Sequence, residues 1–184
     1  MSLDICQLAA CHATATPITI RFADVDMMRV VHHSAYIHYF EQIRFAFLHN
    51  LMKLDTAILL REAIACPVIE CQAKYFRALR FGNEATGYGK VHVLRAAMFR
   101  FEYWIVRNRD PDALCASGST THCFVDEKLQ LLLRAPRLFT DAFAMTKVLF
   151  PGCFVDEGLA PADSAEGETV SLPADEMVGR STAS

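Results

Sequence analysis

The sequence lacks the features of membrane proteins and of secreted, disulfide-rich proteins. No apolar run approaches the roughly 18 residues that a membrane-spanning helix needs. The first residues, Met1 to Gln7, contain an acid but no Lys or Arg, which is the opposite of a secretory signal. Leu8-Ala-Ala-Cys11 resembles a lipoprotein cleavage box, but it has neither a basic start nor a long apolar segment before it. We therefore expect a cytoplasmic protein without a membrane span.

The sequence also lacks the spacings typical of disulfide frameworks and metal sites. It has 7 cysteines, an odd number, and no two of them form a C-x-x-C pair. Free thiols in a reducing compartment are the simplest interpretation. The 7 histidines include no H-x-x-x-H pair with a nearby carboxylate. We therefore predict no metal site.

Charge separates the acidic end of the chain from the rest. From Asp156 onward there are seven acidic residues and one basic residue, so the rest of the chain carries a net charge of +3. This last segment is too polar to offset its ordering entropy by burial. We predict an N-terminal extension at 1–16, one domain at 17–150 and a flexible acidic tail at 151–184. The mildly basic body suits a small anionic ligand, but without aromatic–basic interleaving it does not indicate nucleic-acid binding.

The hydrophobic pattern predicts one long helix and a series of strands. Between Ser34 and Lys53, apolar residues recur mostly every three or four positions, and Ser34 is a plausible N-cap. Other segments have β-branched or alternating patterns and end in turn residues. We expect strands at 17–22, 68–76, 85–94, 97–107, 114–125 and 129–134, and a closing helix at 136–149. This order predicts an α+β fold in which an antiparallel β-sheet wraps around one long central helix.

Asp26 is the residue that most clearly indicates chemistry. It follows the first predicted strand, precedes the long helix, and has mostly apolar neighbours, so we expect its carboxylate to be desolvated. The first turn of the helix offers unpaired backbone N–H groups and the positive end of a dipole. A carboxylate beside such donors can act on a carbonyl group. Alternatively, Asp24 and Asp26 only cap a loop.

Four segments, in this order, resemble the 4-hydroxybenzoyl-CoA thioesterase-like family of hotdog-fold acyl-CoA thioesterases. The first is the most distinctive, with a D-x-D pair before the helix and an aromatic-Glu-x-x-Arg on it. The segments are RFADVDMMRVVHHSAYIHYFEQIR at 21–44, CPVIECQAKYFRALRFGN at 66–83, FRFEYWIV at 99–106 and LCASGSTTHCFV at 114–125.

The resemblance implies roles for particular residues. Asp26 aligns with the family's catalytic carboxylate, which acts as a nucleophile or as a general base. His33 aligns with the residue whose backbone N–H polarises the thioester carbonyl. Arg29, which stands where the family usually has Gly, and His32 could shape the acyl pocket or contact Asp26. Tyr36 and Arg95 complete the predicted substrate-binding residues, with Arg95 the best-matched contact for the CoA phosphates and Arg77 and Arg80 weaker candidates.

The resemblance also implies an activity and an assembly. The expected reaction is hydrolysis of an acyl-CoA thioester to a free carboxylic acid and CoA, without a cofactor, since CoA is part of the substrate. The expected assembly is a homodimer or homotetramer with the site between protomers. An acyl-carrier-protein thioesterase and a non-catalytic acyl-CoA-binding protein are the alternatives. The D-x-D motif argues against a dehydratase.

Overall fold

The computed structural model describes residues 11–94 and 97–156. The sheet strands come in one continuous series after the long helix, except for the first and the last. The helices are α2 (Ala35–Asn50), α3 (Thr56–Arg61) and α4 (Arg137–Leu149), with short 3-10 turns η1 (His12–Thr14), η2 (Phe22–Asp24) and η3 (Pro151–Cys153). The strands are β1 (Thr16–Thr19), β2 (Val68–Tyr75), β3 (Glu84–Val93), β4 (Met98–Arg107), β5 (Asp110–Cys123) and β6 (Phe154–Asp156).

Five of the strands form a path in the order β1-β3-β4-β5-β2, and every pair along this path is antiparallel. The short strand β6 pairs with β3 in parallel, through Val91 and Phe154 among others. The strand β2 lies at the end of the path and pairs only with β5 among the described strands. Its other edge therefore presents backbone N–H and C=O groups that no described strand satisfies.

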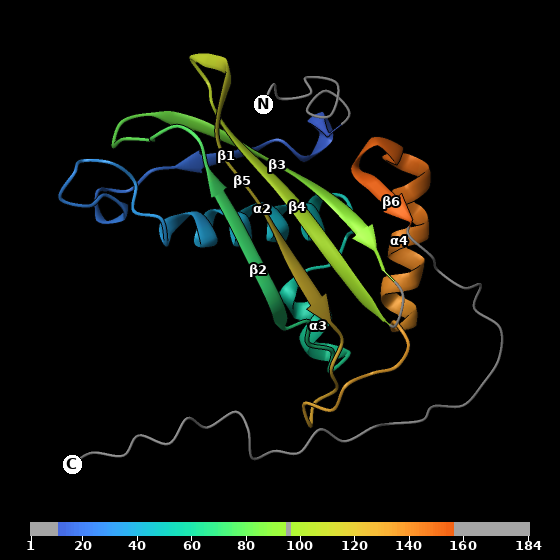
Figure 1. Cartoon of the computed structure of the whole chain (residues 1–184). Helices are drawn as coiled ribbons and strands as arrows, with labels where there is room; N and C mark the ends of the chain where they lie inside the picture. Colours follow the sequence, from blue (N-terminus) through green and yellow to red (C-terminus); the bar gives the residue numbers. More distant parts are fainter. Residues whose placement is uncertain (1–10, 95–96, 157–184) are drawn as a thin grey trace, which may run out of the picture.

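The helix α2 lies along one face of this sheet (Figure 1). Its apolar face is fully buried, and the Phe40 ring stacks on Tyr103 of β4 with centroids 4.8 Å apart. Two glycines allow the helix to approach closely. A Cβ at Gly87 would collide with Ile43, and one at Gly118 would collide with Phe40. The position of α2 on the sheet is therefore fixed by direct contact rather than by a side-chain layer of variable thickness.

The closing helix α4 packs beside the β3–β6 side of the sheet (Figure 1). Phe139 and Phe143 of α4 are buried and contact the aromatic rings of Phe99 and Phe124. One hydrophobic core thus extends from α2 to α4. The loop between β1 and α2, which contains Asp26, leads into the N-terminal end of α2.

The α+β architecture predicted from the sequence, an antiparallel sheet around one long helix, is confirmed. The long helix, the closing helix and five strands occur close to their predicted positions. The strand predicted at 129–134 is wrong, because Leu129 has a left-handed backbone and only Leu131 makes an isolated bridge, to Val125. The short helix α3, the short strand β6 and the three 3-10 turns were not predicted.

The described part of the predicted acidic tail begins inside the fold. Residues 151–156 form η3 and β6, and Asp156 accepts a hydrogen bond from Lys147 of α4 at 2.8 Å. The remainder of the predicted tail and most of the predicted N-terminal extension lie outside the described residues. Within 11–94 and 97–156, no helix has the length and hydropathy needed to cross a membrane.

Candidate active site

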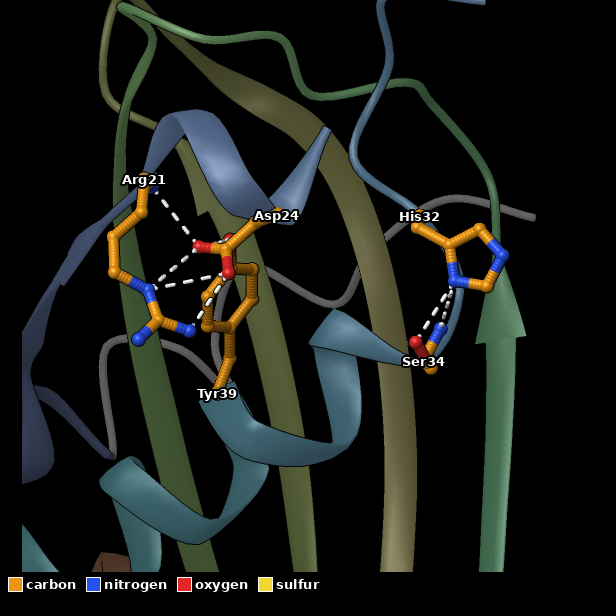
Figure 2. Close-up of polar contacts among 5 residues, drawn as sticks. All are labelled: Arg21, Asp24, His32, Ser34 and Tyr39. Carbon is orange, nitrogen blue, oxygen red and sulfur yellow. Dashed lines mark hydrogen bonds and ion pairs between the residues drawn. The ribbon is translucent and has the colours of Figure 1, made fainter. Parts of the chain in front are cut away.

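The loop that leads into α2 is held by a buried carboxylate, Asp24. Its side chain accepts hydrogen bonds from the Arg21 backbone N–H at 2.9 Å, from the Arg21 guanidinium at 2.7 Å and from the Tyr39 hydroxyl at 3.0 Å (Figure 2). The ion pair with Arg21 lowers the pKa of Asp24 despite its burial. Burial and the adjacent Asp24 raise the pKa of Tyr39. Asp24 is therefore an ionised structural group that connects the loop to α2.

Asp26 forms the tight turn that follows. Its backbone N–H donates to the Val30 carbonyl at 2.9 Å, and its carbonyl accepts from the Arg29 N–H at 2.9 Å. Its Oδ1 accepts from the Met28 N–H at 2.8 Å and, more weakly, from the Val30 N–H at 3.5 Å. Arg29 has a φ of 62°, the left-handed conformation that favours glycine. The carboxylate is thus held through one oxygen, and Oδ2 has no hydrogen-bond donor among the described residues.

The start of α2 is capped by an imidazole rather than by a serine. His32 Nδ1 lies 2.8 Å from the Ser34 hydroxyl and accepts from the Ser34 N–H at 3.3 Å (Figure 2). Ser34 itself has helical dihedral angles and makes no side-chain cap, contrary to its predicted role. The His33 carbonyl accepts from the Tyr75 hydroxyl of β2 at 3.1 Å. The backbone N–H of His33, however, has no acceptor among the described residues.

Two hollows meet at Asp26. The hollow on the helix side has a volume of about 330 Å³ and is lined by Asp26, Val30, Val31, His33, Tyr36 and residues 75–78. Burial raises the pKa of the Tyr36 hydroxyl to about 12, so this group stays protonated at neutral pH. This hollow therefore brings together Asp26, a carboxylate residue, and His33, whose backbone N–H has no acceptor among the described residues. A carboxylate and a free backbone donor are the kinds of group that acyl transfer uses.

The hollow on the turn side is larger, at about 530 Å³. Asp26 and Arg29 line it together with Arg80, which follows β2 in the chain, and its walls include two aromatic rings. These rings, Phe22 and Phe81, make an edge-to-face contact with centroids 5.9 Å apart. The structure therefore places the loop before α2 against the turn between β2 and β3.

The structure brings together most of the predicted site residues. Asp26, His33 and Tyr36 line one hollow, and Asp26 and Arg29 line the other. The possible contact between His32 and Asp26 is absent among the described residues, because the imidazole caps the helix instead. Arg95 lies outside the described residues.

The predicted desolvation of Asp26 is wrong for the single chain. Asp26 is only half-buried, and Met27 and Met28, which were expected to shield it, are 101% and 78% exposed. Apolar residue types predict burial only when another surface is available to cover them. A group that covers the turn would have to come from outside the described residues.

Three residues of the hollows were missed or undervalued from the sequence: Phe22, Tyr75 and Phe81. Phe22 lies far in sequence from Tyr75 and Phe81, and it comes near them only because the sheet brings the end of β2 and the turn after it beside the loop before α2. The one available signal was the position of Phe81 in the Arg-Phe-Gly-Asn turn. Within the described ranges, no group of three His, Cys, Asp or Glu side chains could hold a metal ion.

Several solved structures have this fold. A hypothetical protein from Thermus thermophilus is 28% identical, with a TM-score of 0.64 over 73% of this chain and 98% of that chain. A DHNA-CoA thioesterase from Staphylococcus aureus is 21% identical, with a TM-score of 0.64 over 77% of this chain and 96% of that one. A 1,4-dihydroxy-2-naphthoyl-CoA thioesterase from Synechocystis is 16% identical, with a TM-score of 0.63 over 70% and 93%. At such identities, the two enzymes show a common fold only.

Sequence comparison gives the family. No curated protein matches the chain. The family model described as the Thioesterase-like superfamily matches residues 20–175, which include the D-x-D loop, the long helix and every strand from β2 onward. The chain therefore belongs to the Thioesterase-like superfamily.

Proposed function

We propose that this protein hydrolyses an acyl-CoA thioester to a free carboxylic acid and CoA, as a member of the 4-hydroxybenzoyl-CoA thioesterase-like branch. The observation that carries the proposal is that Asp26 and His33, whose backbone N–H has no acceptor among the described residues, line the same hollow at the start of α2. Membership of the Thioesterase-like superfamily and the fold shared with named thioesterases support it.

Asp26 can act by either of two routes. As a nucleophile, Oδ2 attacks the thioester carbonyl, a mixed anhydride forms, and the CoA thiolate leaves; water then hydrolyses the anhydride. As a general base, the carboxylate takes a proton from water, which attacks the carbonyl and expels the same thiolate. In both routes the carbonyl oxygen gains negative charge, and the His33 N–H would stabilise it by about 3 kcal/mol, the usual contribution of one such donor.

The test is a thiol-release assay with short-chain, long-chain and aromatic acyl-CoA substrates, on the wild type and on Asp26→Asn. We expect hydrolysis of at least one class, and a loss of about a hundredfold or more in kcat for Asp26→Asn. Turnover of the variant close to that of the wild type would show that Asp26 is not the catalytic group. Binding of an acyl-CoA without turnover would favour a non-catalytic acyl-CoA-binding protein. Turnover of an acyl-carrier-protein substrate alone would favour an acyl-carrier-protein thioesterase.

We further propose that the protein works as a homodimer or homotetramer in which a second copy covers the exposed turn. Several large apolar side chains around the site and on β2 are exposed in the single chain, which is a sign of an interface. They are Phe22, Met27, Met28, Val68, Ile69, Tyr75, Phe76 and Phe81. The open edge of β2 offers eight residues of backbone for pairing with another strand.

Light scattering coupled to size-exclusion chromatography tests this assembly. We expect a dimer or tetramer, and a shift towards the monomer, with loss of turnover, when Ile69 on β2 is changed to Lys. A monomeric wild type would contradict the proposal. Leu60→Lys on α3 serves as the control, because it also adds a positive charge at an exposed apolar residue.

A further inference from the structure

The turn-side hollow is lined by two arginines, Arg29 and Arg80, that form no ion pair with any described residue. Among the described residues, the Arg29 guanidinium makes no hydrogen bond or ion pair. Arg80 donates one hydrogen bond, from Nη1 to the Arg29 carbonyl at 3.4 Å. The only acidic residue lining the hollow is Asp26, whose Oδ1 accepts from the backbone of its own turn. The lining therefore carries a net charge of +1 and still has guanidinium groups available for an anion.

The walls of the hollow favour a flat apolar group between Asp26 and these charges. Phe22 and Phe81 meet edge to face and form an aromatic corner. A volume of about 530 Å³ is within the usual range of small-molecule pockets. An aromatic ring fits such a corner, since rings prefer offset or edge contacts with other rings.

The position of Asp26 decides which end of the substrate enters this hollow. Asp26 lines both hollows, so a thioester carbonyl beside it has one arm on each side. In CoA, the whole pantetheine arm separates the sulfur from the phosphates. Arg29 is only three positions from Asp26 in a tight turn, and Arg80 is hydrogen-bonded to that turn. Guanidinium groups so near the reacting carbonyl suit an anion on the acyl group better than the distant phosphates.

We infer that Arg29 and Arg80 form a site for a carboxylate on the acyl group, and that the substrates are acyl-CoA esters, preferably aromatic, whose acyl part bears a second carboxylate. This inference rests on the proposed function, because it assumes that the thioester lies at Asp26. It assigns a role to Arg29: the guanidinium occupies a turn position where glycine would be less strained, and it turns the acyl pocket into an anion-binding pocket.

Two matched substrates test the inference. We would compare para-carboxybenzoyl-CoA with para-carbamoylbenzoyl-CoA, which has nearly the same shape and no charge on the acyl group. The measured quantity is the ratio of their kcat/KM values. We expect the wild type to prefer the carboxylate, and we expect this ratio to fall about tenfold in Arg29→Gln and in Arg80→Gln, the usual effect of losing one hydrogen bond to a charged group. Arg61→Gln, at an exposed arginine of α3 paired with Glu62, is the matched control.

The same comparison with N-acetylcysteamine thioesters, which lack the CoA phosphates, shows whether the arginines bind the acyl carboxylate or the phosphates. An equal fall of the ratio with these esters supports the inference. A wild-type ratio near one, or a ratio that neither variant changes, would overturn it. A uniform loss with both CoA esters and none with the N-acetylcysteamine esters would also overturn it, because the arginines would then bind the phosphates.

A failure of the proposed function gives a different result. If the wild type hydrolyses none of these esters, the affinities of the corresponding non-hydrolysable thioethers of CoA, measured by calorimetry, replace the rate ratio. Tighter binding of the carboxylated thioether, lost in both variants, would support the anion site without catalysis. Equal affinity of the two thioethers would contradict it.

Discussion

The chain makes the same turn twice, once at Asp26 and once at Asp126. At Asp126, as at Asp26, the backbone N–H donates to the carbonyl four residues on, and Oδ1 accepts from the backbone two and four residues on. The fourth residue of the turn is left-handed in both cases, with φ values of 62° at Arg29 and 59° at Leu129. Both aspartates are half-buried.

The surroundings of the two turns differ. The turn at Asp26 lies before the start of α2, Asp26 shares one hollow with His33, and both hollows are lined by Asp26. The turn at Asp126 follows β5, and Asp126 lines neither hollow. The turn at Asp26 also follows the buried carboxylate of Asp24, which accepts hydrogen bonds from Arg21 and Tyr39. A loop-capping aspartate and a candidate catalytic aspartate thus have the same local geometry, and only the neighbouring groups distinguish them.

The largest expected effect compares Asp26→Asn with Asp126→Asn. Both changes replace one carboxylate oxygen by an amide nitrogen and keep an oxygen that can accept the hydrogen bonds of the turn. We expect a loss of kcat of about a hundredfold or more for Asp26→Asn. For Asp126→Asn we expect activity within about twofold of the wild type, because surface changes away from special features have small effects. Equal losses in both variants, measured by thiol release, would mean that the turn rather than the carboxylate matters.

The second effect tests what holds the turn at Asp26 in place. Asp24→Asn removes the charge of a buried carboxylate that accepts hydrogen bonds from Arg21 and Tyr39. We expect the free energy of unfolding to fall by about 1 to 2 kcal/mol at neutral pH, less than for a fully buried pair because the Arg21 side chain is mostly exposed. Asp126→Asn, which has no such partners among the described residues, should change it by less than about 0.5 kcal/mol.

The pH dependence of stability tests whether Asp24 stabilises the protein in its ionised form. Because the folded protein lowers the pKa of Asp24 below its ordinary value of 3.8, the contribution of Asp24 to stability is complete above that value. It disappears as the pH falls through the lower pKa of the folded state. Urea unfolding should therefore show a difference between wild type and Asp24→Asn that is constant near neutral pH and vanishes in strong acid. A difference that grows on acidification would refute the ion pair.

The smallest effect comes from the left-handed positions. A glycine at position 29 or 129 relieves backbone strain but makes the unfolded chain more flexible, so we expect a gain of only about 0.5 kcal/mol in either variant. Leu129 is exposed, so Leu129→Gly loses little burial. Only Arg29→Gly should also reduce the preference for carboxylated acyl groups. Thermal unfolding and the substrate ratio together test whether the two turns differ in function but not in strain.

The sequence was sufficient to predict the elements with long, regular patterns. The spacing of Tyr36, Phe40, Ile43 and Phe47 predicted α2 because all of them are buried against the sheet. The strand predicted at 129–134 failed because its apolar leucines follow a turn that breaks the ladder at Leu129. The strand β6 has three residues and pairs with β3, a distant partner in sequence, so no local pattern could reveal it.

The candidate site was predictable only along the loop that contains Asp26. Arg29, which stands where the family usually has Gly, has the positive φ that favours glycine. Phe81 and Arg80 come from the opposite side of the hollow, and no spacing in the sequence relates them to Asp26. The shielding of Asp26 was mispredicted since Met27 and Met28 point away from the chain's own core. Local sequence thus indicates the candidate reactive group but not the hollows around it.

The contacts of Gly87 and Gly118 with α2 separate a rigid part of the site from a part that can vary. Ile43 and Phe40 occupy the space that a Cβ at Gly87 or Gly118 would need, so α2 packs closely on the sheet at these two positions. His33, just before α2, is also tied to the sheet, because its carbonyl accepts a hydrogen bond from the Tyr75 hydroxyl of β2. Under the proposed function, substitutions in the turn at Asp26 and around Arg80 should change the accepted acyl group while the proposed polarising donor, the His33 N–H, stays in place.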